Sequence, residues 1–63
     1  MNKVYVIKDT VSLGYYKGLG AFGGYFYAQK FNSHEEAEGR VSTMFAVINR
    51  EVSVTIETVY EKE

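Results

Sequence analysis

The chain has 63 residues, no cysteine, one histidine and a formal net charge of −1. This length allows one domain, residues 1–63, of marginal stability. The absence of cysteine excludes disulfides and thiolate metal sites, and one histidine leaves almost no ligands for structural zinc. Four lysines against one aspartate give residues 1–30 a charge of +3, and three basic residues against seven glutamates give residues 31–63 a charge of −4. Neither half has the basic stripe typical of a nucleic-acid-binding protein.

The first residues, Met1 to Tyr5, alternate between polar and apolar side chains and are soon followed by Lys8 and Asp9. They lack the apolar core of a signal peptide. No apolar run in the chain approaches the length of a membrane span. We therefore expect a cytoplasmic protein that does not enter a membrane.

The first third of the chain predicts a β-hairpin. Residues 3–8 are rich in valine, tyrosine and isoleucine, which favour strands, and both faces of this strand are largely apolar. Asp9 and Thr10 begin a turn, and residues 13–17 form a second short strand. Two short strands this close favour antiparallel pairing.

Residues 18–24 contain four glycines, at positions 18, 20, 23 and 24. This density is incompatible with a helix interior or an ordinary strand interior, so the sequence predicts a loop. Residues 25–31 return to strand-like composition, but residues 25–27 fit equally well a loop whose rings fold inward.

A helix is expected from Ser33, because Ser33 and Glu36 form a capping box. Acidic side chains in the first turn favour the positive end of the helix dipole. Apolar residues then recur at helical spacing, and the helix should end near residues 49–50.

The last strand, residues 51–60, alternates apolar and polar side chains, as does a half-exposed antiparallel strand. The expected core comprises Ala37, Val41, Met44, Phe45, Ile48, Val52, Val54 and Ile56.

The predicted fold is therefore a small α+β domain with the order β-β-(β)-α-β. An antiparallel sheet of three to four strands carries one helix on one face. We expect the first and last strands to lie side by side in the centre of the sheet.

This layout resembles that of very small accessory proteins of bacteriophages. The resemblance rests on the strand Tyr5 to Lys8, on Gly14 to Tyr16, on the segment Ala28 to Glu38 and on the terminal strand. Some such proteins act early in infection as inhibitors of host or defence proteins. The resemblance thus implies a binder of a bacterial protein in the host cytoplasm, and its motifs carry no catalytic residues.

Nothing in the sequence predicts an enzyme or a cofactor. Gly18, Gly20 and Gly23 have the spacing of a nucleotide-binding loop, but the helix that such a loop requires does not follow. His34 lies in the first turn of the predicted helix, where a histidine is normally solvated, and no nucleophile stands at a recognisable spacing from it.

Single-stranded nucleic acid is an alternative partner. Residues 4–7 and 17–22 faintly resemble the two aromatic motifs of RNA-recognition domains, although too little chain separates them. Tyrosines near Lys3, Lys8 and Lys17 would stack on unpaired bases. A purely structural subunit is a further alternative.

The aromatic surplus is the main evidence for a binding surface. Six aromatic residues fall within positions 15–27, and one helix covers only one side of the sheet. Tyrosine is enriched at protein interfaces, so we expect partner-binding residues here, unless the segment folds back as a lid. We also expect self-association through the sheet or this segment. The candidates are Tyr15, Tyr16, Leu19, Phe22, Tyr25 and Tyr27.

The outer face of the predicted helix is a second candidate surface, because its side chains are all small. It includes Gly39, Ser42, Thr43 and Ala46. A third candidate is the acidic side of the last strand, with Glu57, Glu61 and Glu63.

Overall fold

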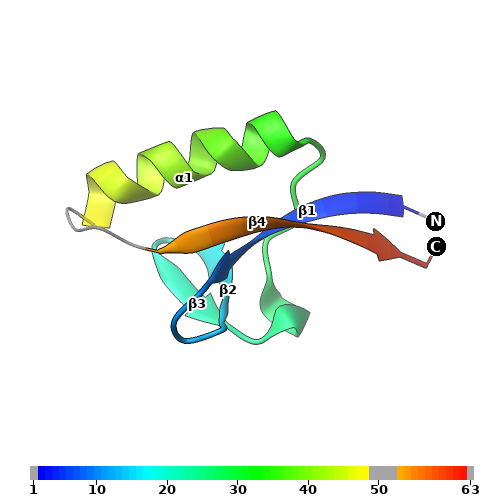
Figure 1. Cartoon of the computed structure of the whole chain (residues 1–63), viewed down its shortest axis with the longest axis horizontal. Helices are drawn as coiled ribbons and strands as arrows, with labels where there is room; N and C mark the ends of the chain where they lie inside the picture. The colour runs from blue at the N-terminus through cyan, green and yellow to red at the C-terminus, as the bar shows by residue number, and fades with distance from the viewer. Residues whose placement is uncertain (1, 49–52, 63) are drawn as a thin grey trace.

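The computed structural model describes residues 2–48 and 53–62, with side chains placed for residues 2–44 and 53–62. It confirms the α+β fold: one antiparallel sheet of four strands carries a single long helix on one face (Figure 1). The elements are β1 (Asn2–Asp9), β2 (Tyr15–Gly18), β3 (Ala21–Gly23), the 3₁₀ turn η1 (Tyr25–Tyr27), α1 (His34–Ile48) and β4 (Val54–Glu61). The strand order is β3-β2-β1-β4.

The first and last strands are paired along their whole length, from Asn2 opposite Glu61 to Asp9 opposite Val54. This confirms that they are neighbours. Of these two strands, however, only β1 lies inside the sheet, because β4 forms one edge. The expectation that both are central was wrong, since β2 and β3 are added on the other side of β1.

The glycine-rich segment is a hairpin and not a continuous loop. Gly18, Leu19 and Gly20 have φ angles of 110°, 55° and 75°, and they turn the chain so that Ala21–Gly23 pairs with β2. Positive φ angles are readily adopted by glycine. The glycines therefore form the turn that allows β3, and the prediction of a loop through residues 21–23 was wrong.

Residues 25–27 form a turn and not a strand, as the second expected form had it, but the rings of Phe26 and Tyr27 are exposed and do not fold inward. Residues 25–27 make a single 3₁₀ turn, and an isolated bridge then joins Phe31 to Tyr5 of β1. The Gln29 N–H also donates to the Tyr16 carbonyl at 2.9 Å. This segment consequently fills the edge of β1 beyond the end of β2.

The start of α1 is the predicted capping box. The Ser33 hydroxyl accepts the Glu36 N–H at 3.1 Å. The Glu36 carboxylate reaches back to the N–H of Asn32 at 3.2 Å, one residue earlier than in the standard box.

The core lies between α1 and the sheet. Of the expected core residues, Ala37 and Met44 are buried, and Val41, Val54 and Ile56 pack against the buried cluster. The side chains of Phe45 and Ile48, and all of Val52, lie outside the described residues. The buried cluster, which includes two aromatic residues, is Ile7, Tyr16, Phe31, Ala37 and Met44. Val6 and Ala28 are also buried, outside this cluster.

Candidate functional site

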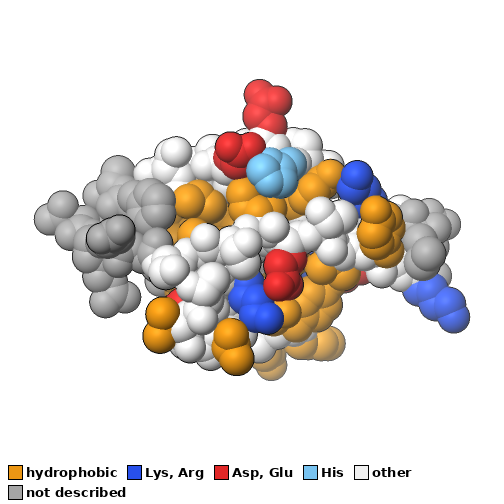
Figure 2. Space-filling model, in the orientation of Figure 1, with side chains coloured by type: hydrophobic (Ala, Val, Ile, Leu, Met, Phe, Trp, Pro, Cys, Tyr) orange, Lys and Arg blue, Asp and Glu red, His pale blue; other side chains and the backbone are white. Residues whose placement is uncertain are grey.

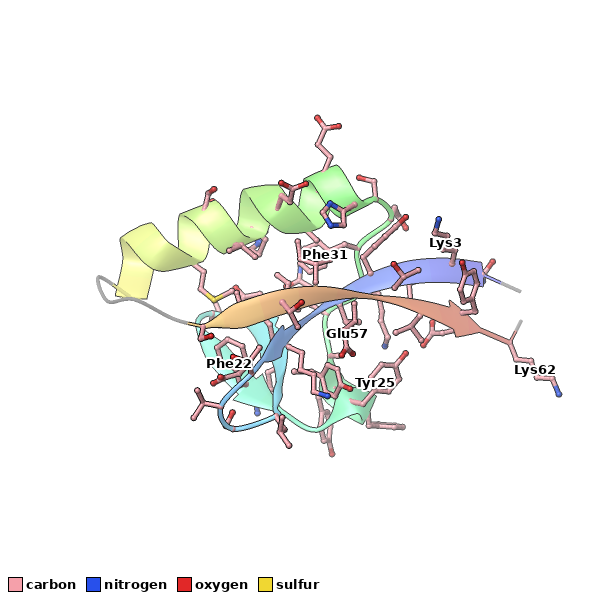
Figure 3. The ribbon with its side chains drawn as sticks, in the orientation of Figure 1. Lys3, Phe22, Tyr25, Phe31, Glu57 and Lys62 are labelled. Carbon is pink, nitrogen blue, oxygen red and sulfur yellow. The ribbon has the colours of Figure 1, made fainter. Side chains whose placement is uncertain are left out.

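The sheet face opposite α1 is covered by aromatic and charged side chains. Ile7 and Ile56 are paired and pack on the α1 side, so their strand neighbours Val6, Lys8 and Glu57 face the other way. Figure 3 shows Phe31 pointing towards α1 and Tyr25 on the opposite side of the sheet. We call this side the aromatic face; it comprises Lys8, Tyr15, Lys17, Tyr25, Tyr27, Lys30, Glu57 and Glu61.

Two tyrosines at the centre of the aromatic face contact each other and β4. The rings of Tyr15 and Tyr25 meet edge to face with centroids 5.3 Å apart. The Tyr25 hydroxyl donates to Glu61 at 3.1 Å, and the Tyr15 hydroxyl to Glu57 at 3.5 Å. Partial burial raises the pKa of Tyr25, and its hydrogen bond to Glu61 raises this pKa further. These contacts tie η1 and β2 to the far edge of the sheet.

Each of three lysines lies over one tyrosine ring of this face. The Nζ atoms of Lys8, Lys17 and Lys30 are 5.5, 6.0 and 5.0 Å from the ring centroids of Tyr15, Tyr27 and Tyr25, respectively. This geometry is typical of cation–π contacts.

Two of these lysines also pair with glutamates. Lys8 lies 3.7 Å from Glu57, and Lys30 lies 3.7 Å from Glu61. Among the described residues Lys17 has no ion pair. Most of the charge on the aromatic face is therefore neutralised within the chain.

At the rim of this face, η1 presents two exposed rings. Phe26 is 86% exposed and Tyr27 is 68% exposed, and their rings meet edge to face at 5.2 Å. Hydrogen bonds from Tyr27 N–H to the Gly24 carbonyl and from Ala28 N–H to the Tyr25 carbonyl fix the turn. The rings thus form an apolar pair on a hydrogen-bonded backbone.

Two exposed leucines occupy turns with left-handed backbone. Leu19, in the β2–β3 turn, has a φ of 55° and a fully exposed side chain. Leu13, in the β1–β2 turn, has a φ of 65° and is 63% exposed. Branched, bulky side chains rarely adopt this conformation, and neither leucine gains burial from it.

The six aromatic-segment candidates divide between the two sides of the sheet. Tyr15, Tyr25 and Tyr27 come together on the aromatic face, and Leu19 is exposed on its turn. Tyr16 is buried in the core, and half-buried Phe22 packs against its ring at 5.7 Å. Successive residues of a strand point to opposite faces, so Tyr16 cannot share a surface with Tyr15 and belongs to the fold.

Phe26 is an exposed residue of the aromatic segment that the sequence candidates left out. Strand-like alternation through residues 25–27 would turn Phe26 inward whenever its two tyrosine neighbours face outward. The 3₁₀ turn replaces this alternation, because it rotates successive side chains by about a third of a turn. Gly23 and Gly24, directly before the three aromatic residues, are turn-favouring residues in the sequence.

On the outer face of α1, Gly39, Ser42 and Thr43 are exposed, whereas the side chain of Ala46 is not among those described. The Thr43 hydroxyl donates to the Gly39 carbonyl at 3.1 Å. A Cβ built on Gly39 meets nothing within 4 Å. No contact among the described residues therefore requires glycine at this position.

The described residues bring together no cluster of three potential metal ligands. The Nδ1 atom of His34 lies 2.7 Å from a Glu38 oxygen, and its ring meets that of Tyr5 edge to face at 5.9 Å.

Gly18 and Gly20 lie in a hairpin turn, and β3 follows them where a phosphate-binding loop would have a helix. Within the described part of the chain, no helix has the length and apolar character needed to cross a membrane.

Comparisons with protein-family models, with curated proteins and with solved structures gave no match.

Proposed function

We propose that this chain is a small protein-binding module whose contact surface is centred on Phe26 and Tyr27. The observation that carries the proposal is the exposure of this ring pair: 86% of Phe26 and 68% of Tyr27 are open to solvent. Phenylalanine and tyrosine are enriched at protein interfaces, and tyrosine is enriched among the residues that dominate binding energy there.

The surroundings of the ring pair support this proposal. Hydrogen bonds within η1, and the edge-to-face contact of Tyr25 with Tyr15, hold the turn against the sheet. A surface that is ordered before binding loses less conformational entropy when its partner arrives. Lys17, over the Tyr27 ring, adds a cation beside the apolar centre.

The target that we propose is a bacterial host or defence protein in the host cytoplasm. This part of the proposal rests on the resemblance to small bacteriophage accessory proteins. A protein of 63 residues inhibits most simply by occupying the site that the target needs for its own partner.

Binding of single-stranded nucleic acid is the second candidate, because the lysine–tyrosine pairs of the aromatic face resemble a stacking platform. Two observations weigh against it. Glu57 and Glu61 lie on the same face and pair with Lys8 and Lys30. Tyr15 and Tyr25 are half-buried and contact each other, so their rings are not free to accept bases. We therefore favour a protein partner.

The experiment compares the wild type with a double variant, Phe26→Ala with Tyr27→Ala, as immobilised bait in bacterial lysate. The matched control is Val11→Ala, which removes an 82% exposed side chain from the β1–β2 turn. A bacterial protein retained by the wild type and the control, but lost with the double variant, is then purified and its affinity measured. We expect a loss of at least about tenfold for the double variant, since truncating a hot-spot residue typically costs over 1 kcal/mol.

An unchanged affinity of the double variant would overturn the assignment of this surface. Titration with a single-stranded oligonucleotide at two salt concentrations tests the second candidate. Saturable binding that weakens steeply with salt, together with no retained protein, would replace the proposal by nucleic-acid binding.

A further inference from the structure

The outer edge of β4 is an open strand edge. β4 is eight residues long and lies at the end of the strand order, and among the described residues no strand pairs with its outer side. The opposite edge, β3, has three residues. The chain has no proline, a residue that in edge strands prevents pairing with a further strand. Valine, isoleucine and threonine in β4 also favour strand pairing.

The backbone hydrogen bonds of β1 indicate which β4 residues carry the open N–H and C=O groups. Tyr5 of β1 exchanges both of its backbone hydrogen bonds with Phe31, and Asp9 N–H bonds the Gly14 carbonyl. Odd-numbered residues of β1 therefore point these groups away from β4, and even-numbered ones point them towards it. The hydrogen bond from the Thr10 N–H to the Ser53 carbonyl, on the β4 side, fits this alternation. In the register of the pair, the outward N–H and C=O groups of β4 then belong to Val54, Ile56, Thr58 and Tyr60.

We propose that this edge binds the same edge of a second copy of the chain. The two β4 strands run antiparallel about a two-fold axis at Thr58, so that the two sheets become continuous and both helices lie on the same side. Thr58 of each copy then exchanges two backbone hydrogen bonds with the other, and Ile56 of each copy does the same with Tyr60 of the other.

Charge selects this register over its neighbours. With the axis at Thr58, Glu57 lies opposite Val59, and Ile56 lies opposite Tyr60. An axis at Glu57 would place the two copies of this glutamate directly opposite each other, and an axis at Val59 would place Glu57 opposite Glu61. Like charges in directly opposite positions destabilise a strand pair, whereas an aromatic residue opposite a β-branched one stabilises it.

The helix side of the sheet has a groove and a side chain that fit each other in this arrangement. A hollow of about 430 Å³ lies between α1 and β4, with Val41, Val54 and Ile56 as its apolar lining. Figure 2 shows apolar side chains on this side of the molecule, between α1 and β4. Tyr60 is 61% exposed on the same side of the sheet.

With the axis at Thr58, Tyr60 of the second copy stands beside Ile56, at this groove. The ring covers the apolar lining, and its hydroxyl reaches the polar rim formed by Glu38 and Ser42. The two-fold axis repeats the contact, so each copy supplies one tyrosine and one groove. This self-complementarity is what an isologous interface requires, and it favours a second copy as the occupant.

The test is a charge exchange at the axis. Thr58 is exposed, so Thr58→Lys and Thr58→Glu should each leave the monomer folded, which far-UV circular dichroism and thermal melts check. We expect sedimentation to show a dimer for the wild type at high micromolar concentration. Each variant alone should be monomeric, because like charges then meet at the axis, and an equimolar mixture of the two should dimerise again.

Three further variants define the interface. Tyr60→Ala should weaken the dimer at least about tenfold, whereas Tyr60→Phe should retain most of it, since burial of the ring dominates. Thr43→Lys, on the outer side of α1, is the control for added charge and should leave the dimer unchanged.

A monomeric wild type at millimolar concentration would overturn the proposal. So would a Thr58→Lys variant that dimerises like the wild type, or a mixture that stays monomeric. Phe26 and Tyr27 take no part in this interface, so its failure would leave the proposed function intact.

Discussion

The ring of Tyr15 in β2 meets the ring of Tyr25 in η1 edge to face at 5.3 Å, and both hydroxyls donate to glutamates of β4. These contacts span the sheet from one side of β1 to the other. They explain why η1 lies against the sheet although none of its three residues is buried. The aromatic face therefore forms a second, partly polar layer opposite the apolar core under α1.

Tyr25 should titrate above the normal tyrosine range. Partial burial and the Glu61 hydrogen bond raise its pKa, so the neutral hydroxyl is favoured in the folded state. Its contribution to stability is then fully present below the unfolded pKa of about 10 and is lost as pH rises through the higher folded pKa. Spectrophotometric titration of the tyrosines should show a late component that Tyr25→Phe removes.

Glu61→Gln provides the control for this titration. It removes the negative charge beside Tyr25 and should lower the late pKa towards its usual range without abolishing the shift, because the effect of partial burial remains. A late component that persists in Tyr25→Phe would contradict the assignment.

Sequence patterns predicted the parts of this fold that depend on local chemistry. The capping box at Ser33 and the apolar stripe with Ala37 and Met44 were found because helix signals are local and periodic. The pairing of β1 with β4 followed from their composition and from the need to cover one sheet face.

The assignment of rings to surfaces was much less predictable. Whether Tyr15 or Tyr16 faces the helix depends on the register of β2, and a shift of one residue exchanges the two. That register is determined by the turn before β2, where Leu13 takes a left-handed conformation and the Asp9 carboxylate bonds Val11 N–H and the Ser12 hydroxyl. No periodic pattern in the sequence predicts such a turn.

Two tyrosines that were both candidates for the surface should differ sharply in their effect on stability. Tyr16 is buried among core side chains, whereas Tyr27 is 68% exposed. Tyr16→Ala should lower the free energy of unfolding by about 3–5 kcal/mol, the usual cost of truncating a large aromatic core residue. Tyr27→Ala should change it by no more than about 0.5 kcal/mol. Urea denaturation followed by circular dichroism measures both free energies. A loss for Tyr16→Ala as small as that for Tyr27→Ala would refute the orientation of β2.

Gly39→Ala should stabilise the protein. Gly39 lies inside α1, a Cβ built there meets nothing within 4 Å, and alanine is favoured over glycine in a helix interior by about 1 kcal/mol. The melting temperature should rise by several degrees, as expected for a domain of this size. Binding to the target should stay unchanged, because Phe26 and Tyr27 lie on the other side of the molecule. A stabilised variant that no longer binds would instead assign the contact surface to the outer face of α1.

Leu19→Asn should raise stability and lower affinity together. Leu19 has a φ of 55°, a left-handed conformation that costs a residue with a Cβ about 1–2 kcal/mol, and its side chain is fully exposed. Asparagine tolerates this backbone conformation, so the free energy of unfolding should increase by up to about 1 kcal/mol. The affinity for the target should fall because the exposed apolar side chain, which the fold does not use, is lost.

Leu13→Asn is the matched control, since Leu13 has nearly the same φ of 65° on a different turn. It should give a similar gain in stability with no change in affinity. If Leu19→Asn is stabilised and binds like the wild type, Leu19 lies outside the contact surface. If neither variant is stabilised, the left-handed turns are not strained.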